Sequence, residues 1–468
     1  MKKSMPAAAV FCIFFIISCS ENKNTSIERE DLFTFEIGRL EDELDMFNLE
    51  GARSIRKTAL KMRDGLFYIS NGNGEKIARY NSYGDLLFLI YNEETNPPPL
   101  TLREKTEGAA VTRWAYKWPL NEPGSITVNS AKHIFVEDRL IPERHVFDRE
   151  QKTVLDRLVL HFDADGQFVD YLGQEGRGGT PFPRIENIFT SVDDDIVVVC
   201  QLPNGRKIFW YDSSGNQIYD IYFSNDTLPV PSDRFGLTPS LDSIGIAPDE
   251  RKIYLKIDYY REIMDESTNT ISGRESDRSC LWMVNAGGNS FSGSIDIPFF
   301  ETSQTVNNHK TIENLLYSMF GVMNGGRVFL YYPIETGFSL LILAADGTKE
   351  QRRGIINVAG DELLYCAFDV SDDGILSALL SSNYEVKLVW WRTDKLAREM
   401  DALPSAPALS SAGGIIQNRY APLMNRLHSP FPQFSGILKI MEHQTHNQIV
   451  SATPKKNPAV TLNLIPIP

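Results

Sequence analysis

A three-strand unit that occurs twice constrains the fold of this chain more than any single segment does, because a repeated unit sets the architecture around it. In the first copy an apolar run, Gly65 to Ser70, leads through Asn73-Gly74 to a second run, Lys76 to Tyr80. A turn that ends at Gly84 then leads to a third run, Leu86 to Ile90. Short runs of this kind, bounded by Gly, Asn and Asp, are typical of β-strands.

The second copy has the same order of runs and turns. It comprises Asp195 to Val199, Asn204-Gly205, Lys207 to Tyr211, a turn that ends at Gly215, and Ile218 to Tyr222. Asn and Gly tolerate the positive φ angles that tight hairpins and turns require, so both turns are expected to be structural. Because extended helical periodicity is nearly absent between the copies and beyond them, the sequence predicts an all-β protein.

The second turn of the unit has weaker counterparts elsewhere in the chain. Each begins at an aromatic or large apolar anchor residue and ends at a glycine four residues later. The closest anchors lie about 50 residues apart, the length of one four-stranded propeller blade. Wider spacings predict insertions at Asn96–Gly124, Ile141–Thr153 and, as a charged hairpin, Asp258–Arg278. We therefore expect a β-propeller of six blades, with anchors at Tyr80, Phe162, Tyr211, Val284, Leu343 and Trp391, the last of which lacks the glycine.

The stretch from Phe162 to Phe223 resembles the NHL repeat. The resemblance rests on the Gly-rich connection Gly173–Gly179, the strand Ile196–Val199, the segment Gly205–Ile208 and the turn Tyr211–Gly215. It is weaker around the first copy and faint in the last three blades, which lack the Arg-Ile pair. The resemblance implies a six-bladed β-propeller of a kind used mostly for binding, with a minority of enzymes.

Two further elements are expected before the first repeat. Phe33, Phe35 and Ile37 alternate with the period of a strand, which we expect to pair with the last blade, close the ring and leave no free sheet edge. Leu40, Leu44 and Phe47 fall on one face of a helical period, so a short amphipathic helix is predicted over Leu40–Phe47.

The amino terminus has the pattern of a secretory signal: Lys2 and Lys3, an apolar run from Ala7 to Ile17, and the small Ser18 before Cys19. The run is too short to span a membrane. Ile16–Cys19 resembles the bacterial lipobox, which implies cleavage before Cys19 and attachment of fatty acyl chains such as palmitate to that residue. The alternative is an ordinary cleaved signal with a chance cysteine.

This interpretation divides the chain into four parts: a signal peptide (1–18), a lipidated Cys19 with a flexible tether (19–31), the propeller (32–400), and a Pro/Ser-rich, poorly ordered tail (401–468). The expected location is the bacterial cell envelope, with the protein facing the periplasm or the cell surface. The formal net charge of −14 argues against nucleic acid as a partner. The same charge disfavours binding to anionic lipid, so the acyl chains are expected to supply the membrane affinity.

Motifs for catalysis or metal binding are weak. No nucleophile elbow stands in an α/β context and no phosphate loop is present, and the glycines of Gly173–Gly179 are expected to form a turn between blades. Asp369–Gly374 starts like a calcium loop, but the twelfth position is Leu380 where a bidentate Glu is required, so a β-turn capped by Asp side chains is predicted. Asp193–Asp195 is expected to be a solvated turn. His443 and His446 lack a third zinc ligand.

Cys200, Cys280 and Cys366 lie in apolar settings and are expected to be buried free thiols, the alternative being a disulfide between two of them. Most aromatic residues are expected in the core, with an aromatic binding platform as the alternative. No catalytic residue, metal site or cofactor is predicted, and Cys19 is the one functional residue. The leading hypothesis is a membrane-anchored scaffold that binds an unidentified protein, peptide or ligand. The alternative is a metal-assisted lyase or hydrolase acting at the central channel of the propeller.

Overall fold

The computed structural model describes residues 25–47, 56–104, 113–233, 235–265, 268, 270–288, 290–306, 309–345, 348 and 351–401. The predicted signal peptide, Cys19 and the predicted tail after Asp401 lie outside these residues, as do His443 and His446. No helix within the described ranges is long and apolar enough to cross a bilayer.

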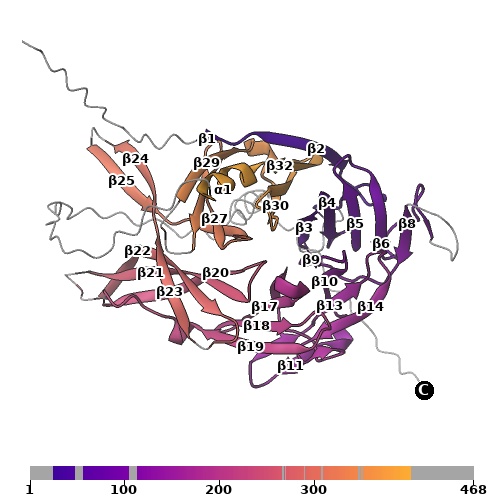
Figure 1. The fold of residues 1–468 in the computed structure, drawn as a ribbon, viewed down its shortest axis with the longest axis horizontal. Coiled ribbons are helices and arrows are strands. Elements are labelled where there is room, and N and C mark those ends of the chain that lie inside the picture. Colours follow the sequence, from indigo (N-terminus) through magenta and orange to yellow (C-terminus); the bar gives the residue numbers. More distant parts are fainter. Residues whose placement is uncertain are drawn as a thin grey trace, which may run out of the picture. The chain divides into compact units, whose positions relative to one another are not determined.

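The described residues form a six-bladed β-propeller, in which blades of four antiparallel strands surround a central axis (Figure 1). Blades 1 to 3 comprise β3 (Thr58–Arg63), β4 (Leu66–Asn71), β5 (Lys76–Asn81) and β6 (Leu86–Tyr91); β9 (Ile126–Val128), β10 (Ile134–Arg139), β13 (Arg157–Phe162) and β14 (Phe168–Gly173); and β16 (Ile185–Thr190), β17 (Ile196–Leu202), β18 (Gly205–Tyr211) and β19 (Gln217–Ser224).

Blades 4 and 5 follow in chain order, and blade 6 combines strands from both ends of the described chain. They comprise β20 (Leu237–Ile246), β21 (Lys252–Asp265), β22 (Thr270–Asn285) and β23 (Phe291–Ile297); β26 (Ser318–Met323), β27 (Arg327–Ile334), β28 (Gly337–Ala344) and β29 (Gln351–Asn357); and β30 (Tyr365–Val370), β31 (Leu376–Ser381), β32 (Glu385–Trp391) and β2 (Arg29–Glu36).

The six anchor residues predicted from sequence all lie at or next to the end of the third strand of a blade, so the blade count and order are confirmed. The glycines that close the turns after Tyr80, Phe162 and Tyr211 have φ angles of 85°, 83° and 79°. A Cβ atom is strained at such angles, which explains why the turn residue is glycine.

The missing glycine after Trp391 has a structural cause. The chain does not turn back into a fourth strand there, but continues into helix α1 (Thr393–Asp401). The fourth strand of blade 6 is β2, which pairs antiparallel with β32 through partners such as Phe35 and Val386. The predicted closure by an N-terminal strand is thus confirmed. A free edge nevertheless remains, because β2 is itself the outer strand of this sheet.

The segment predicted to be a helix, Leu40–Phe47, is not one. It consists of bends and turns, and Leu44 forms a parallel bridge with Ile37. The side-chain amide of Asn71 fixes the chain at Asp45, because it accepts a hydrogen bond from the N–H of Asp45 and donates one to the carbonyl of Asp45, over 3.1 and 2.9 Å. Leu44 and Met46 are each 1% exposed, a spacing of two that fits an extended chain rather than a helix.

Residues 25–31, which the sequence assigns to a flexible tether, belong to the propeller. β1 (Thr25–Ser26) pairs in parallel with β29 of blade 5, and β2 begins at Arg29. In Figure 1 the indigo strands β1 and β2 run beside the orange β29 and β32. Backbone pairing, rather than an apolar pattern, orders this polar segment, so composition alone could not reveal it.

The Asn-Gly pairs lie in hairpins as expected, but the positive φ angles do not fall on both residues of each pair. In blade 1 the residue with positive φ is Glu75, at 48°, and neither Asn73 nor Gly74 has one. In blade 3 the loop joins Leu202 to Gly205, and Gly205 has φ of 148°. The position of the turns is confirmed, and their detailed geometry differs.

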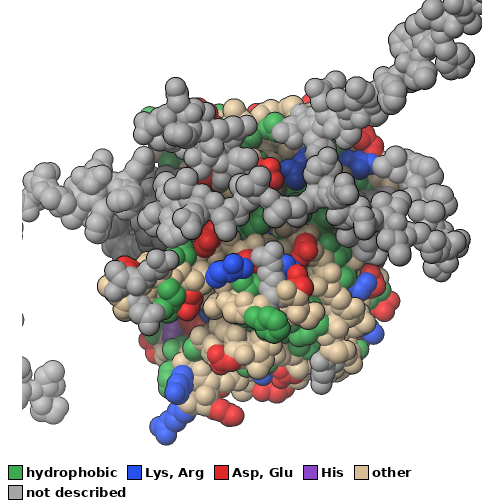
Figure 2. Space-filling view, turned by 90° about the vertical axis from the view of Figure 1, so that its left-hand side faces the viewer, with side chains coloured by type: hydrophobic (Ala, Val, Ile, Leu, Met, Phe, Trp, Pro, Cys, Tyr) green, Lys and Arg blue, Asp and Glu red, His purple; other side chains and the backbone are tan. Residues whose placement is uncertain are grey.

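The predicted insertions contain strands of their own. The insertion after blade 1 adds β7 (Arg103–Glu104) and β8 (Trp114–Lys117), and the insertion in blade 2 forms the hairpin β11 (Val146–Asp148) and β12 (Thr153–Leu155). β21 and β22 extend beyond their blade as one long hairpin. A further hairpin, β24 (Phe300–Val306) with β25 (His309–Leu315), was not predicted. On the side of the molecule that faces left in Figure 1, Figure 2 shows acidic and basic side chains intermingled rather than a patch of one sign.

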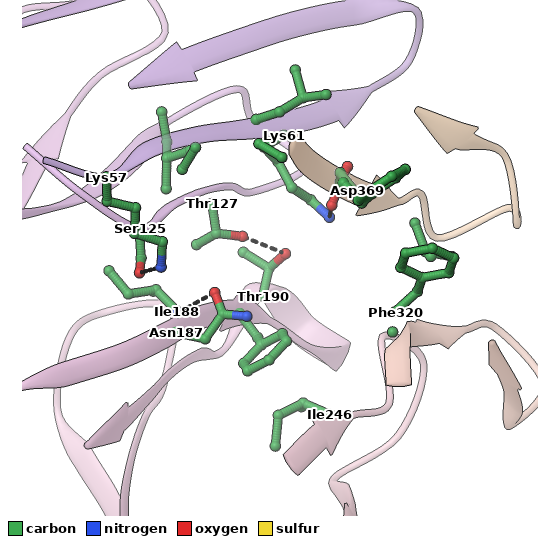
Figure 3. A pocket seen from close by; sticks show the side chains of 18 of the residues that line it. Lys57, Lys61, Ser125, Thr127, Asn187, Ile188, Thr190, Ile246, Phe320 and Asp369 are labelled. Atoms are coloured by element: carbon green, nitrogen blue, oxygen red, sulfur yellow. Dashed lines mark hydrogen bonds and ion pairs between the residues drawn. The ribbon is translucent and has the colours of Figure 1, made fainter. Parts of the chain in front are cut away.

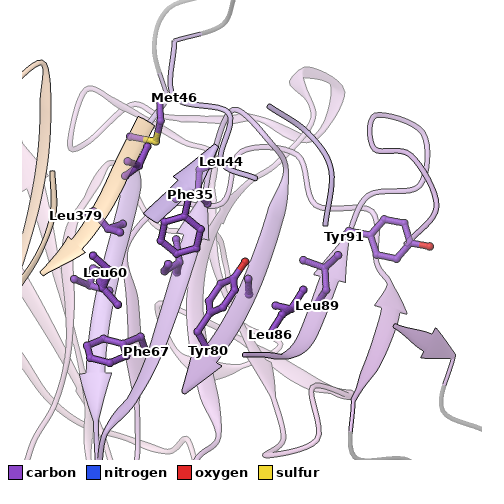
Figure 4. Packing of buried hydrophobic residues seen from close by; sticks show 14 of the residues in the cluster. Phe35, Leu44, Met46, Leu60, Phe67, Tyr80, Leu86, Leu89, Tyr91 and Leu379 are labelled. Carbon is purple, nitrogen blue, oxygen red and sulfur yellow. The ribbon is translucent and has the colours of Figure 1, made fainter. Parts of the chain in front are cut away.

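Apolar side chains fill the space between neighbouring blades. Between blades 6 and 1, for example, Phe35 of β2 and Leu379 of β31 lie in one cluster with Leu60, Phe67 and Tyr80 (Figure 4). Phe35 and Tyr80 pack edge to face, with ring centroids 5.1 Å apart, a favoured aromatic geometry. The N-terminal strand therefore contributes to the core as well as to the backbone pairing.

The turns between the first and second strands of the blades form a closed ring of polar contacts at one end of the propeller. Each interface between neighbouring blades contributes at least one contact, so the last blade is joined to the first in the same way as the others. The contacts are Asp64 with Lys132, Ser130 N–H with Asp194 (2.8 Å), Ser191 Oγ with Ala247 O (2.7 Å), Gly325 N–H with Asp249 (2.7 Å), Asn324 N–H with Asp372 O (2.9 Å) and Arg63 with Asp372 (3.3 Å).

Candidate ligand-binding channel

The first strands of all six blades, or the residues that adjoin them, line one cavity on the axis of the propeller, with a volume of about 260 Å³. β3, β9, β16, β20, β26 and β30 each contribute to its wall. Because side chains of a strand alternate between its two faces, Ala59 and Lys61 of β3 are partly exposed in the cavity, whereas Leu60 and Met62 are buried in the core cluster between blades.

The wall formed by blades 1 to 3 is polar. Lys57 Nζ donates to Ser125 Oγ over 2.6 Å and to the carbonyl of Glu186 over 3.1 Å, so it joins three blades. Thr127 and Thr190 approach each other with their hydroxyls 3.4 Å apart. Asn187 is exposed to the cavity. Figure 3 shows these side chains gathered on one side of the pocket.

A second lysine in the wall is neutralised. Lys61 Nζ lies 3.0 Å from a carboxylate oxygen of Asp369, whose other oxygen accepts from the N–H of Met62 over 2.8 Å. Burial acts to lower the pKa of Lys61, but the charges of Asp369 and Asp372 outweigh it and raise that pKa. Burial also raises the pKa of Asp369, against the effect of Lys61. The pair connects blades 1 and 6 across the closure of the ring.

Lys57 has the opposite electrostatic environment. It is exposed to the cavity, yet protein surrounds it, and this burial lowers the pKa of its ammonium group despite the nearby Glu137 and Glu186. No carboxylate lies within ion-pair distance of Lys57 among the described residues. The two channel lysines thus differ in kind, because Lys61 has its counter-ion and Lys57 does not.

The wall formed by blades 4 to 6 is mainly apolar. Ile246, Phe320, Val322 and Phe368 line it, and in Figure 3 Phe320 and Ile246 lie across the pocket from the polar side chains. Phe320 is fixed by stacking on Tyr331, with ring centroids 3.9 Å apart. The cavity is therefore divided into a side rich in hydrogen-bond donors and an aromatic, aliphatic side.

The carboxylates in the cavity wall are Asp369 and Asp372, and each has a cationic partner, Lys61 and Arg63 respectively. The sequence-based alternative of a metal-assisted enzyme would place carboxylates or histidines around an ion on the axis. Within the described ranges no group of three or more His, Cys, Asp or Glu side chains is disposed to hold a metal ion.

Two acidic motifs singled out from sequence occupy turns, with a correction for one residue in each. Ser371–Gly374 forms the predicted β-turn, but Asp369 does not cap it and instead contacts β3. Asp193 is solvated, whereas Asp195 is 1% exposed and binds the side chains of Trp210 and Arg251 over 2.9 and 2.6 Å. The expectation of a solvated turn was therefore wrong for Asp195.

The glycine-rich segment Gly173–Gly179 connects blades 2 and 3, as expected. Tyr211 donates a hydrogen bond to the carbonyl of Gly173 over 2.8 Å.

The three cysteines of the described chain are free thiols. Cys200 and Cys280 are buried and Cys366 is partly buried, so the disulfide alternative is not supported. Cys366 lies in the cavity wall, where burial raises its pKa to about 12.

Sequence reasoning did not identify Lys57, Lys61 or Asn187 as members of a site. A signal for them exists in retrospect, since polar residues alternate with apolar ones on or beside the first strand of a blade, where the alternate face meets the axis. Reading that signal requires the assignment of first strands, whereas the three-strand unit recognised in the sequence begins with the second strand of a blade.

No protein-family model and no curated protein matches this chain, so the resemblance to NHL repeats stays a prediction. Among solved structures, similar ones include an α-L-arabinofuranosidase from Fusarium graminearum (8% identity, 78% of this chain and 99% of that chain, TM-score 0.40). Another is a Penicillium chrysogenum α-L-arabinanase complexed with arabinobiose (10% identity, 77% of this chain and 98% of that chain, TM-score 0.39). A third is a calcium-binding protein, regucalcin, from Agrobacterium tumefaciens (10% identity, 79% of this chain and 96% of that chain, TM-score 0.35).

Proposed function

We propose that this protein is a binding scaffold of the bacterial cell envelope, anchored by lipid on Cys19, and that the central channel of its propeller holds a small ligand. The observation that carries the proposal is the division of one axial cavity into a donor-rich wall and an aromatic wall. Ligand sites commonly combine an apolar lining with a few placed polar groups. The volume of about 260 Å³ is near the lower end of such sites, which favours a compact ligand.

The anchoring part of the proposal rests on the sequence from Lys2 to Cys19. Two or more acyl chains on one residue hold a protein firmly at a membrane without a spanning helix. An acidic propeller gains little from anionic lipid, so the lipid would carry the attachment. A protein or peptide partner in the envelope would then meet the scaffold at the membrane.

Blocking the channel tests its assignment as the binding site. Asn187 is exposed to the cavity, so Asn187→Trp places an indole inside it, whereas Tyr384→Trp alters a surface residue that is 85% exposed. Small molecules that raise the melting temperature of the wild-type protein are expected to act equally on Tyr384→Trp and to lose their effect on Asn187→Trp.

Ligands that raise the melting temperature of Asn187→Trp as much as that of the wild type would contradict the proposal, because they would then bind outside the channel. Recovery of the ligand after incubation with the protein separates binding from an enzymatic reaction. A ligand that is held without conversion is recovered unchanged after incubation, and a substrate is consumed.

A further inference from the structure

We propose that the ligand of the channel is a small organic anion, whose carboxylate meets Lys57 and Asn187 and whose apolar body lies against Phe320 and Phe368. This inference rests on the proposed function, because it names the class of ligand for the same cavity. It is argued from the hydrogen bonds of the polar wall, the charges around Lys57 and the chemistry of the opposite wall.

The hydrogen bonds of Lys57 leave donor capacity directed at the cavity. An ammonium group has three donors and no acceptor. Two are directed at Ser125 Oγ and at the carbonyl of Glu186, which are both neutral acceptors. The side chain is exposed to the cavity, so a bound anion can reach the third donor and supply the missing counter-charge.

The charged groups around Lys57 do not already supply that counter-charge. The carboxylates whose charges act on Lys57 are Glu137 and Glu186, and the cations are Arg184 and Arg157. Glu137 is paired with Arg157 at 3.2 Å, and Glu186 with Arg206 at 2.8 Å. Since both carboxylates have their own guanidinium partners, Lys57 is left without a counter-charge, and Arg184 adds a further positive charge to this corner of the channel.

Asn187 adds donors beside the ammonium group. Its amide oxygen accepts from the N–H of Ile188 over 3.0 Å, so the amide NH₂ is turned the other way. Within the described residues this NH₂ donates no hydrogen bond, and the side chain is exposed to the cavity. An ammonium group from blade 1 and an amide NH₂ from blade 3 can bind the two oxygens of one carboxylate, and charge-assisted hydrogen bonds of this kind are strong.

The opposite wall of the cavity determines the chemistry of the rest of the ligand. Phe320 and Phe368 are partly exposed, and their ring centroids lie 4.7 Å apart. Ile246 and Val322 complete this side. A purely polar anion would leave the two phenylalanine rings facing water, whereas a ring or short alkyl chain would cover them. A compact aromatic acid combines both requirements.

Three phenyl probes of similar size separate charge from shape: phenylacetate, phenylacetamide and 2-phenylethylamine. Their binding to the purified full chain is measured by titration calorimetry at pH 7. Phenylacetate is expected to bind about tenfold more tightly than the amide, a difference of about 1.4 kcal/mol, and the amine is expected to bind most weakly. In Lys57→Met the preference for the carboxylate disappears. In Lys395→Met, a variant of an exposed lysine on α1, it persists.

A wild-type arm keeps the test valid if Lys57→Met folds poorly. The carboxylate favours the charged lysine, so its affinity falls as the pH rises through the pKa of Lys57, and binding takes up protons there. The affinity of the neutral amide stays constant. Equal binding of carboxylate and amide, or no saturable binding of the carboxylate, overturns the anion inference. If the amide binds and Asn187→Trp abolishes its binding, the channel remains the site and only the ligand class is wrong.

Discussion

Arg29 and Glu362 form an ion pair in which Nη1 and Oε2 are 2.6 Å apart, although the residues are separated by 333 positions. Arg29 begins β2, and Glu362 ends the 3₁₀ turn η4 (Gly360–Glu362) that leads into β30. A second guanidinium nitrogen reaches the other carboxylate oxygen over 2.9 Å. This bidentate contact fixes the N-terminal strand to the blade that it completes.

Removing Arg29 is therefore expected to weaken the closure of the ring. Arg29→Ala leaves the carboxylate of Glu362, which is 7% exposed, with Lys387 as its remaining cation. We expect the free energy of unfolding to fall by about 1–3 kcal/mol, as for other hydrogen bonds to charged groups, measured by urea denaturation. Asp31→Asn, which alters the exposed partner of Arg29, is the control and should cost less than about 0.5 kcal/mol. Equal losses of the free energy of unfolding in Arg29→Ala and Asp31→Asn would show that the contact of Arg29 with Glu362 does not stabilise the closure of the ring.

The contact between Arg29 and Glu362 also makes the stability of the protein depend on pH. The hydrogen bond from Arg29 lowers the pKa of Glu362 from its ordinary value of 4.5 to about 2. Because the folded state binds this proton less readily than the unfolded state, the stabilisation is present above about pH 4.5 and is lost as the pH falls towards 2. The wild type should therefore be more stable than Glu362→Gln at pH 6, and the difference should shrink as the pH falls through this range. A constant difference in urea midpoint would show that the pair does not titrate.

The buried carboxylate of Asp195 joins blades 3 and 4 through Arg251. Asp195→Asn replaces one acceptor oxygen with an NH₂ group that faces a guanidinium donor, so the free energy of unfolding should fall by about 1–3 kcal/mol. Asp193→Asn is the matched control in the same turn, where the side chain is 73% exposed. It should change the free energy by less than about 0.5 kcal/mol. A loss of stability in Asp193→Asn as large as that in Asp195→Asn would contradict the role of Asp195 in joining blades 3 and 4.

Cys19→Ala tests the proposed lipid anchor. Without the thiol no diacylglyceryl group can be attached, so the protein should move from the membrane fraction to the soluble fraction after cell disruption. The melting temperature should be unchanged, since the first described strand begins at Thr25. Retention of Cys19→Ala in the membrane fraction would exclude the lipid as the anchor.

The repeat architecture could be predicted because its signals are local. A glycine with positive φ closes each clear turn, and the anchor residue before it ends a third strand, so a few adjacent residues specify each blade. The strand around Phe33 and Phe35 was recognised from its alternation, although its partner β32 lies at the other end of the described chain. Local pattern failed at Leu40–Phe47, where the amide of Asn71 outweighs a helical spacing.

The channel could not be predicted, because it depends on contacts between distant blades. The ion pair of Lys61 with Asp369 joins residues 308 positions apart, and neither residue suggests the other in sequence. Lys57, Ser125 and Asn187 come from three different blades. Their meeting follows from the ring geometry, which the sequence implies only as a whole.

The most direct test of the account is competitive acetylation of the two channel lysines across a pH series, read by mass spectrometry of the wild-type protein. Only the neutral amine reacts, so the pH dependence of labelling reports each pKa. We predict that Lys57 is labelled with a midpoint below the ordinary lysine value and that Lys61 is labelled with one above it. Labelling of Lys57 should also slow in Asn187→Trp. Identical titration of the two lysines, with no effect of Asn187→Trp, would contradict an open channel with an unpaired cation.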